Sequence, residues 1–560
     1  MKLIKNNLWI FLSLLLSFIA IIPFFHKGFF TFHDNIQVQR VFEMTKALAD
    51  GMFPVRWSLD LGYGYGYPLF NFYAPFAYYI GSVFNILGFD SLIATKIMIA
   101  LAIVLSGLSM FAFVKEMFGK KAAFLASIFY VFAPYHALDI YVRGDVAEVW
   151  AYVFIPLVFY AIYKQFKSQN AINIIIGALA YAGLILSHNL TALMVTPFIL
   201  IFTIVLSFLK KEKKSSILLF TPLILGTILS AFYWIPVFME MGFTNVISQV
   251  GGGAEYKDHF VCLYQLWTSP WGFGGSAPGC IDGLSFMIGK IHLIFAFISL
   301  IIFFIGLKLR KVNREDIILF SFFVVSFFVS VFFTLDYSKF IWQALHPMAF
   351  FQYPWRFLII ASFFISVIAA SSIYFLEILF KKVEFIWFFV LIVLISISII
   401  IFNQKFFVPQ ELINVNNNDY TNKVALSWSA SEISSEYMPK GFQKPTIISK
   451  LADFNSLSTN NISIKVIQRK TQETELEINV VKKGSYIFPI AFFPSWKAYL
   501  DSREISLSEN TKGVELNLPT GVHILKFVYR QTIVELVSDL ISFAGILIII
   551  IVIIKNRIKK

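Results

Sequence analysis

The chain has 560 residues, of which 58% are hydrophobic and only 14% are charged. This composition excludes a soluble protein, because a soluble core cannot bury so many apolar side chains. The net charge of +13 fits either an anionic partner or the orientation of membrane helices, and its distribution along the chain decides between the two.

Continuous apolar runs of about 20 residues predict transmembrane helices, since the strands of a barrel would alternate apolar and polar residues. The first run, 8–25, follows Lys2 and Lys5 and lacks a small-residue cleavage site, so we expect an uncleaved span with a cytoplasmic amino terminus. The other predicted spans are 96–114, 122–137, 147–163, 171–187, 191–209, 216–235, 291–308, 317–334, 357–378, 385–402 and 536–554. The sequence therefore predicts a polytopic α-helical membrane protein with about twelve spans.

The segment 70–90 is apolar but contains Asn71, Pro75 and Asn85. If it does not cross the membrane, the basic loops and the tail all face the cytoplasm, as the positive-inside rule requires. These basic groups are Lys115/Lys120/Lys121, Lys164/Lys167, Lys210/Lys211/Lys213/Lys214, Lys308/Arg310/Lys311/Arg314, Lys381/Lys382 and Lys555 to Lys560. We therefore expect 70–90 to lie along the outer interface as a juxtamembrane helix or re-entrant segment. The charge is then explained by the lipid bilayer, and no nucleic-acid partner is expected.

A change of composition marks the carboxy-terminal part of the chain. Alternating runs at Ile462–Ile467, Leu476–Val481 and Gly521–Tyr529 are separated by turn-forming residues and predict a β-rich extracytoplasmic domain. The predicted division is a transmembrane domain at 1–403 with outer loops 26–92 and 236–290, the β-rich domain at 404–535, and a final helix with a basic cytoplasmic tail at 536–560.

Polar residues gather at the predicted outer ends of the helices, where they cost least. Asp34 follows the first span, and its spacing to Gln37 is typical of a capping box at a helix start. A carboxylate held at that position is also well placed to accept a proton. The two interpretations are compatible.

A second cluster combines Arg143, Asp145 and Glu148 at the start of a predicted span. The two acidic residues are three apart and share a helix face. They could be an electrostatic cap of the helix. However, an unpaired carboxylate that leads into an apolar span is expensive, which favours a functional role for Glu148.

Other outer residues are candidates for binding an anion or a metal. His188 lies in a tight turn, and Arg356 either reaches the lipid headgroups or binds an anionic lipid head. A divalent metal is compatible with the histidines, although their spacing is not diagnostic of one and the sequence identifies no cofactor. These histidines are His33, His136, His188 and His346. Cys262 and Cys280 share the loop 236–290, where a disulfide can form.

Several motifs occur in a familiar order over residues 1–360. They are His33-Asp34, Pro54–Trp57, Gly62–Tyr73, Ala133–Tyr135, Tyr141–Asp145 with Glu148, Ser187–Thr191, Trp271–Gly274 and Asp282–Phe286. This ordered set resembles the 6-pyruvoyl-tetrahydropterin-synthase-related membrane proteins, a label that implies no pterin chemistry here. Separately, Phe493–Asp501 and Leu518–Arg530 resemble the carboxy-terminal domain of YfhO-like membrane proteins. Both groups are similar to the GT-C superfamily of glycosyltransferases.

The resemblance implies a membrane enzyme that transfers a hexose or pentose from a polyprenyl-phosphate donor to an envelope glycan, lipid or protein at the outer face. In that superfamily the first outer loop carries a catalytic acidic residue, which corresponds by position to Asp34. The residues expected to bind the donor phosphate or the acceptor are His33, Arg56, Arg143, Asp145, Glu148, His188 and Arg356. Two other functions fit the same sequence: a glycolipid transporter or flippase, and a noncatalytic scaffold that recruits wall polymers through its β-domain.

Overall fold

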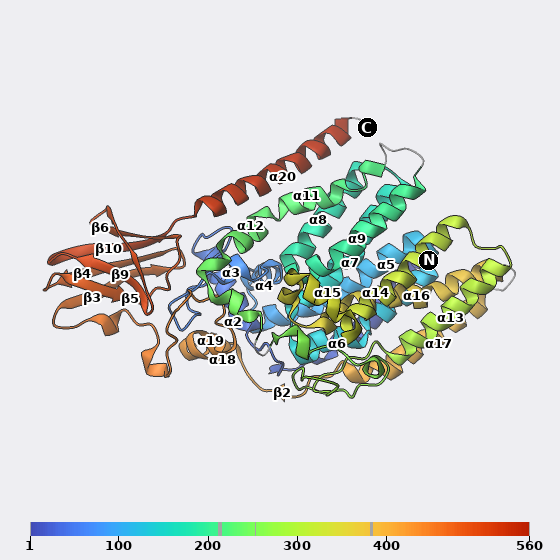
Figure 1. Cartoon of the computed structure of the whole chain (residues 1–560), viewed down its shortest axis with the longest axis horizontal. Coiled ribbons are helices and arrows are strands. Elements are labelled where there is room, and N and C mark those ends of the chain that lie inside the picture. The colour runs from blue at the N-terminus through green and yellow to red at the C-terminus, as the bar shows by residue number, and fades with distance from the viewer. Residues whose placement is uncertain (1, 211–215, 252–253, 381–384, 559–560) are drawn as a thin grey trace.

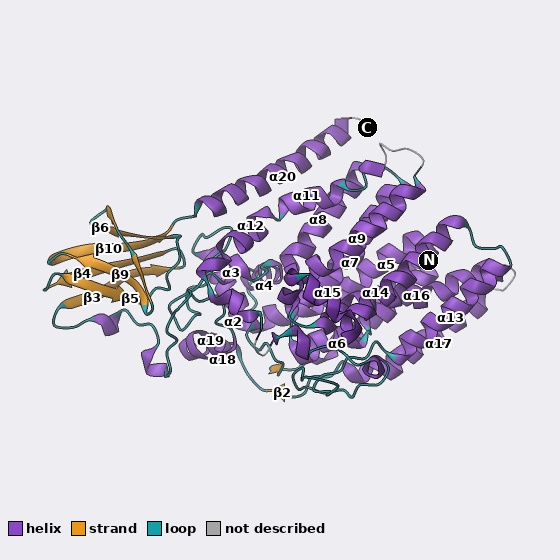
Figure 2. Cartoon of the chain, in the orientation of Figure 1, coloured by secondary structure: helices purple, strands orange, loops and turns teal. Residues whose placement is uncertain are grey.

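The computed structural model describes residues 2–210, 216–251, 254–380 and 385–558. The chain is largely helical, and the strands of residues 462–529 are gathered at one end of the long axis (Figure 1, Figure 2). Some residues of the predicted basic loops lie outside the described residues: Lys211, Lys213, Lys214, Lys381, Lys382, Lys559 and Lys560.

By length and composition, nine helices of the described residues could cross a membrane, or ten if one bent pair counts as a single span. The nine are α1 (Lys2–Ser17) with η1 (Phe18–Phe25), α5 (Ser91–Val131), α7 (Val146–Lys167), α9 (Asn189–Leu209), α13 (Lys290–Lys308), α14 (Arg314–Thr334), α16 (Leu358–Leu379) continued from η10 (Pro354–Phe357), α17 (Phe385–Asn403) and α20 (Ile533–Ile558). The bent pair is α11 (Thr221–Leu229) and α12 (Ala231–Glu240), at 66°.

The described part of the chain has fewer candidate spans than the twelve predicted, because the boundaries of its helices differ from those of the apolar runs. The helix α5 combines two predicted spans, which are separated by a non-helical break at Gly119 (φ 81°). The helix α8 (Ala171–Ser187) has 17 residues, slightly fewer than the roughly 20 that cross a bilayer without adjustment. Helix is present at every predicted span, which confirms the polytopic helical architecture.

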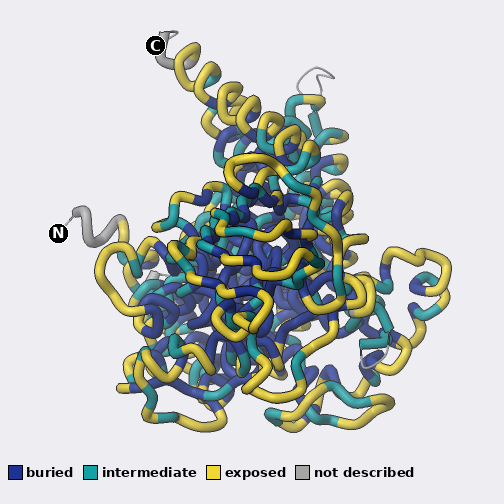
Figure 3. Tube along the Cα trace, turned by 90° about the vertical axis from the view of Figure 1, so that its left-hand side faces the viewer, coloured by how far each residue is buried: buried dark blue, intermediate teal, exposed yellow. Residues whose placement is uncertain are grey.

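The many phenylalanines fill the space between the helices. Phe113 of α5, Phe159 of α7 and Phe363 of α16 form one cluster with ring centroids 4.9 to 5.8 Å apart. Nearly all of α16 is buried. In contrast, α20, which leads to the C-terminus marked in Figure 3, is largely exposed at the edge of the bundle. Exposed apolar side chains on such an outer helix are suited to contact with lipid rather than water.

The segment 70–90 forms two short helices, α3 (Leu69–Phe72) and α4 (Phe76–Ile86). With 11 residues, α4 is too short to cross a bilayer, in agreement with the expectation that this segment does not span. It packs against α2 (Gln37–Ala49) and α5. The loop 26–92 therefore holds a small folded layer next to the bundle.

The carboxy-terminal strands form two antiparallel sheets that pack on each other. The larger has the order β3-β4-β10-β6-β7 and the smaller β5-β9-β8. The strands are β3 (Ile462–Lys470), β4 (Glu473–Val480), β5 (Gly484–Phe488), β6 (Trp496–Leu500), β7 (Arg503–Ile505), β8 (Ser508–Asn510), β9 (Gly513–Leu518) and β10 (Gly521–Tyr529). The rings of Phe488 and Phe527 pack against each other between the sheets, with their centroids 5.3 Å apart. The three alternating runs of the sequence correspond to β3, β4 and β10, which confirms the predicted β-rich region.

The part of the chain between α17 and β3 contains several short helices and packs on the loop 26–92. Its strand β2 (Leu412–Ile413) pairs with β1 (Phe29–Phe30). Ser427 donates to the carbonyl of Asp60, and Ser431 accepts from the Tyr63 amide. The short helices here are η11 (Gln404–Phe406), α18 (Asn417–Thr421), η12 (Ala425–Ser429), α19 (Ala430–Ile433), η13 (Ile448–Lys450) and η14 (Asn455–Leu457). The division into 1–403, 404–535 and 536–560 remains our proposal.

Short helices also line the remaining loops. They are α6 (Pro134–Leu138), η2 (Asp139–Arg143), η3 (Met241–Phe243), η4 (Asn245–Gln249), η6 (Tyr256–Asp258), η7 (Leu263–Leu266), η8 (Asp336–Ser338), α15 (Lys339–Ala344) and η9 (His346–Phe351). The ones that matter most for chemistry are η2 and η10, because each carries an arginine that points into the same polar cluster.

Candidate functional site

The candidate site is built around a sharp turn between η2 and α7. Gly144 has φ 68°, and a Cβ at this position would lie 2.1 Å from the Phe32 ring, so the turn requires glycine. The turn lets Asp145 begin α7, where its carboxylate accepts the amide proton of Glu148. The predicted electrostatic cap is therefore present.

Arg143 is buried at the centre of this turn and binds three carboxylates. It contacts Asp139 and forms ion pairs of 2.7 Å with both Asp145 and Glu148. Its guanidinium also lies over the Trp355 ring, 4.8 Å from the centroid. A buried arginine requires such partners, since an unpaired charge in this position would be strongly destabilising. The structure thus brings together the second predicted cluster.

Arg356 and His188 reach the same cluster from other parts of the chain. The Nε atom of Arg356, on η10, lies 3.1 Å from a carboxylate oxygen of Glu148. His188 begins α9, and its Nδ1 accepts the amide proton of Thr191. A ring nitrogen of His188 and carboxylate oxygens of Asp145 and Glu148 all lie within 4.8 Å of one another. Predicted binding residues from three distant parts of the sequence therefore share one site.

The charges of the cluster are set by burial and by its arginines. Burial alone would raise the pKa of Asp145, but Arg143, followed by His188 and Arg356, outweighs it and lowers that pKa to about 2. Burial lowers the pKa of the His188 imidazole. With a pKa of about 2, the Asp145 side chain is a carboxylate near neutral pH.

Asp34 lies beside this turn, but it does not cap α2. The helix begins at Gln37 after Ile36, which makes no side-chain capping bond, so the predicted capping box is wrong. Instead the Asp34 amide donates to the Arg143 carbonyl at 2.9 Å. The Gln37 side chain donates to the carbonyl of Gly144. Long-range contacts to the η2–α7 turn have replaced the local cap.

The Asp34 carboxyl is half-buried and has an unusual acidity. Burial raises its pKa to about 6, and the nearby Asp145 adds to this rise. Arg40, Arg143 and His33 oppose it. A carboxyl with this pKa is ionised at neutral pH and is a stronger base than an ordinary aspartate, which suits proton transfer.

His33 lies at the edge of the site rather than inside it. Its side chain is exposed, and Nε2 is 2.9 Å from the carbonyl oxygen of Phe273. Phe273 lies in the loop closed by the disulfide between Cys262 and Cys280, whose Cα atoms are 5.6 Å apart. The bond that the sequence allowed is therefore formed, and it holds this loop next to the residue that precedes Asp34.

The cluster is a poor fit for a bound metal. Asp145 and Glu148 already accept from Arg143, and Glu148 also accepts from Tyr135. His188 uses Nδ1 for Thr191. A cation would have to displace these contacts. Of the other histidines considered, His136 bonds the Val131 carbonyl and stacks on Tyr152.

Comparison with known proteins identifies the part of the chain that carries most of this cluster. Residues 70–252 match the model of the 6-pyruvoyl-tetrahydropterin synthase related domain, described as a membrane protein. The resemblance of the motifs is confirmed for this stretch, which includes Arg143, Asp145, Glu148 and His188. Asp34 precedes the 6-pyruvoyl-tetrahydropterin synthase related domain, and Arg356 follows it.

One curated relative, an uncharacterized protein of Lactococcus lactis subsp. cremoris (strain MG1363), is 24% identical over 322 residues. The alignment covers 55% of this chain and 51% of the relative, so the chain spans about half of that protein's length.

Two solved structures are also similar. The apo oligosaccharyltransferase of Archaeoglobus fulgidus has a TM-score of 0.46 at 14% identity, covering 73% of this chain and 56% of that one. The arabinofuranosyltransferase AftD from Mycobacteria has a TM-score of 0.48 at 11% identity, covering 75% of this chain and 28% of that one.

Arg56 is the predicted phosphate-binding residue that the structure places elsewhere. Its guanidinium is buried and bonds Asn71 and Asp539, each at 2.6 Å, and its Nε is 3.9 Å from Glu535. The two acidic residues lie on α20, outside the 6-pyruvoyl-tetrahydropterin synthase related domain. Arg56 therefore joins the loop 26–92 to the last helix, a role that its sequence context did not reveal.

Replacing Arg56 with glutamine is expected to lower the free energy of unfolding by about 2 kcal/mol, because charged hydrogen bonds to α20 are lost. Thermal unfolding of the detergent-solubilised protein would measure this. Arg530→Gln is the matched control, since Arg530 is exposed just before α20. Equal melting temperatures for the two variants would contradict the role assigned to Arg56.

Several residues of the site were not expected from the sequence. Arg40 is buried on α2 near Asp34, and Trp355 lies under Arg143. Asp139 precedes Arg143 by four residues and contacts it, a spacing at which an acidic and a basic residue on a helix meet. That spacing was the one signal available for Asp139. Nothing local marks Arg40 or Trp355, because their partners come from other segments.

Proposed function

We propose that this protein is a GT-C-type glycosyltransferase, which moves a hexose or pentose from a polyprenyl-phosphate donor to an envelope glycan, lipid or protein. We place it in the cytoplasmic membrane with both termini in the cytoplasm and the candidate site at the outer face. The observation that carries the proposal is the pairing of Asp34, whose pKa is raised to about 6, with a neighbouring cluster that contains two arginines.

In the proposed reaction, an acceptor hydroxyl attacks the anomeric carbon of the donor sugar. The new bond joins that carbon to the acceptor oxygen, and the bond to the phosphate oxygen breaks with its electron pair. Asp34 takes the proton of the hydroxyl as general base. The departing polyprenyl phosphate gains negative charge, which Arg356, Arg143 and His188 are close enough together to stabilise.

The acidic partners of the arginines have a supporting role in this mechanism. Burial raises the pKa of Asp139 well above its ordinary value, and the ion pair with Arg143 opposes this rise. The carboxylates of Asp145 and Glu148 then balance the charges of Arg143 and Arg356. Balanced charges hold both guanidinium groups in fixed positions, and fixed donors stabilise a developing phosphate charge without reorganisation. His33 would contact the acceptor from the exposed edge.

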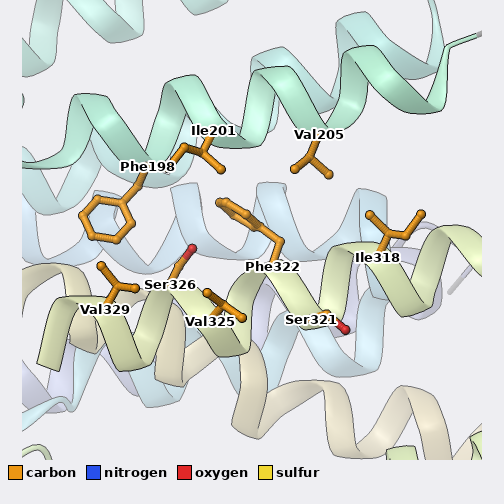
Figure 4. Close-up of a pocket in the computed structure, with 9 residues that line it drawn as sticks. All are labelled: Phe198, Ile201, Val205, Ile318, Ser321, Phe322, Val325, Ser326 and Val329. Carbon is orange, nitrogen blue, oxygen red and sulfur yellow. The ribbon is translucent and has the colours of Figure 1, made fainter. Parts of the chain in front are cut away.

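An apolar groove offers a place for the lipid part of the donor. It lies between α9 and α14, has a volume of about 290 Å³, and is drawn in Figure 4. Phe198 and Phe322 form its buried floor, while Ile201 and Val325 are exposed at its rim. Phe198 follows His188 by ten residues, about 15 Å along the helix. A phosphate at His188 and a prenyl chain in this groove would thus lie along one helix.

The experiment is a transfer assay with the purified full chain in liposomes. Polyprenyl-phosphate-linked hexoses and pentoses are offered with an envelope extract, and mass spectrometry detects the glycosylated product. Transfer is expected, and Asp34→Asn should abolish it. Movement of the lipid-linked sugar across the bilayer without cleavage would instead indicate a transporter. Neither transfer nor movement, with binding of wall polymers retained, would indicate a scaffold.

Chelation tests the view that arginines rather than a metal stabilise the phosphate. We expect transfer in excess EDTA to stay within about twofold of the untreated rate, because the carboxylates are already occupied by Arg143 and Arg356. The control is the same assay after addition of Mg²⁺ or Mn²⁺. Loss of transfer with EDTA and recovery with either ion would show that this assignment is wrong.

A further inference from the structure

Arg40 is a buried charge that the proposed mechanism does not use. It lies on α2, six residues after Asp34, and only 3% of it is exposed. Arginine is rarely buried so completely unless it is paired. Its surroundings therefore indicate what it does.

The partners of Arg40 include residues from the carboxy-terminal part of the chain. One terminal nitrogen donates to the hydroxyl of Ser434 at 2.9 Å, and that hydroxyl donates to the carboxylate of Glu436. The guanidinium also lies over the ring of Tyr73, 4.1 Å from its centroid. Ser434 and Glu436 belong to the segment that links α17 to the β-sheets. This segment therefore reaches into the layer that carries Asp34.

A chain of hydrogen bonds leads from Arg40 to the turn of the candidate site. The second terminal nitrogen donates to the Tyr78 hydroxyl, which donates to the side-chain oxygen of Gln37 at 2.7 Å. The amide of Gln37 donates to the Gly144 carbonyl at 2.9 Å. Every side chain in this chain is buried. Arg40 is thus connected through fixed contacts to the turn between Arg143 and Asp145.

Arg40 also acts on Asp34 through its charge. The charged and titratable groups that face Asp34 are Asp145, Arg40, Arg143 and His33. Besides Asp34, the groups with the largest effects on Arg40 are Tyr78, Tyr73, Tyr67 and Glu436. Among the cations that favour the ionised form of Asp34, Arg40 has the largest effect. Without Arg40, burial and the like charge of Asp145 would raise the pKa of Asp34 further.

We propose that Arg40, held in place by Ser434 and Glu436, is a positioning residue that fixes the Gly144 turn beside Asp34 through Tyr78 and Gln37. The segment 404–461 is then part of the candidate active site and not only a connection to the β-sheets. This inference rests on the proposed function only for the role of Asp34 as base. The contacts that hold Arg40 are independent of any substrate.

The test measures the protonation of Asp34 without an activity assay. Dicyclohexylcarbodiimide reacts with protonated carboxyl groups in apolar surroundings, so the purified full chain is labelled between pH 5 and 9. Mass spectrometry of the peptide that contains Asp34 gives the fraction labelled at each pH. The wild-type midpoint is expected near 6. In Arg40→Gln the midpoint should rise by about one pH unit, because a nearby cation is lost.

Two further variants separate charge from packing. In Arg40→Lys the labelling midpoint should lie close to the wild-type value, since lysine restores the charge. Ser434→Ala should raise the midpoint less than Arg40→Gln does. The matched control is Arg469→Gln. Arg469 also joins the carboxy-terminal part to the loop 26–92, through Asp60 and the Gly64 carbonyl, and it is not among the charged groups with the largest effects on Asp34. Its midpoint should equal that of the wild type.

An unchanged midpoint in both Arg40→Gln and Ser434→Ala would overturn the proposal. An equal shift in Arg469→Gln would also overturn it, because the effect would then come from general loosening. Should Arg40→Gln fail to fold, as judged by size-exclusion chromatography, Ser434→Ala and Arg40→Lys decide the outcome. A shifted midpoint together with no sugar transfer in the wild type would support the role of Arg40 and reject the proposed function.

Discussion

Replacing Asp34 with asparagine is expected to lower the rate of sugar transfer by about 10²- to 10⁴-fold, the usual contribution of a general base. Asparagine keeps the size of the side chain but cannot accept the proton. The rate of product formation by the purified protein, measured at saturating donor, would show the loss in kcat. A rate within a few-fold of the wild type would remove Asp34 as the base.

The control for this variant is Asp90→Asn. Asp90 caps α5 through the amide of Ile93, and asparagine is an equally good capping residue. We expect unchanged transfer in this variant, since Asp90 is exposed and distant in the chain from the η2–α7 turn.

The pH dependence follows from the acidity of Asp34. Because its pKa is raised to about 6, wild-type transfer should fall as the pH drops below 6. The folded state binds this proton more tightly than the unfolded state, so the contribution of Asp34 to stability is largest at low pH and is lost as the pH rises through 6. Asp34→Asn should therefore not lower the melting temperature at pH 7. A large decrease would attribute its loss of transfer to misfolding.

The largest expected effect on stability comes from Arg143→Gln. This change leaves Asp145 and Glu148 buried without their main cation, and breaking a buried ion pair in this way costs about 3–5 kcal/mol. Thermal unfolding in detergent would measure the decrease. The cost should be smaller at low pH, where carboxyl groups take up protons and no longer need a counter-charge.

Two further variants test whether the loss of stability comes from the ion pairs of Arg143. Arg143→Lys keeps the charge but cannot bind several carboxylates at once, so an intermediate loss is expected. Arg503→Gln is the control, because Arg503 is exposed on β7 and its loss should change stability by less than about 0.5 kcal/mol. If Arg143→Gln were as stable as this control, the ion pairs of the cluster would not be what holds the η2–α7 turn together.

Local patterns predicted the features that depend on neighbouring residues. Asp145 begins α7 as its spacing to Glu148 suggested, and the alternation in 462–467 became a strand with one buried face. The same reasoning failed for Asp34, whose spacing to Gln37 is that of a capping box. There the backbone of Arg143 and Gly144 offered hydrogen bonds that a local motif cannot include.

Arg56 and Arg40 illustrate what remained hidden. Both arginines lie in or next to the aromatic loop that follows the first span, and their surroundings in sequence do not distinguish them. Arg56 pairs with Asp539, 483 positions later, whereas Arg40 bonds Ser434, 394 positions later. A pattern of neighbouring residues holds no information on partners at such separations.

The sequence by itself determined that this chain is a helical membrane protein with a β-rich carboxy-terminal region, because the length of an apolar run and the period of a strand are local properties. The tertiary structure decided which polar residues meet. In the folded chain Arg143, Asp145, Glu148, His188 and Arg356 form one cluster, whereas Arg56 pairs with an acidic residue of α20. Buried charges require partners, and which partner each one finds depends on how the helices pack.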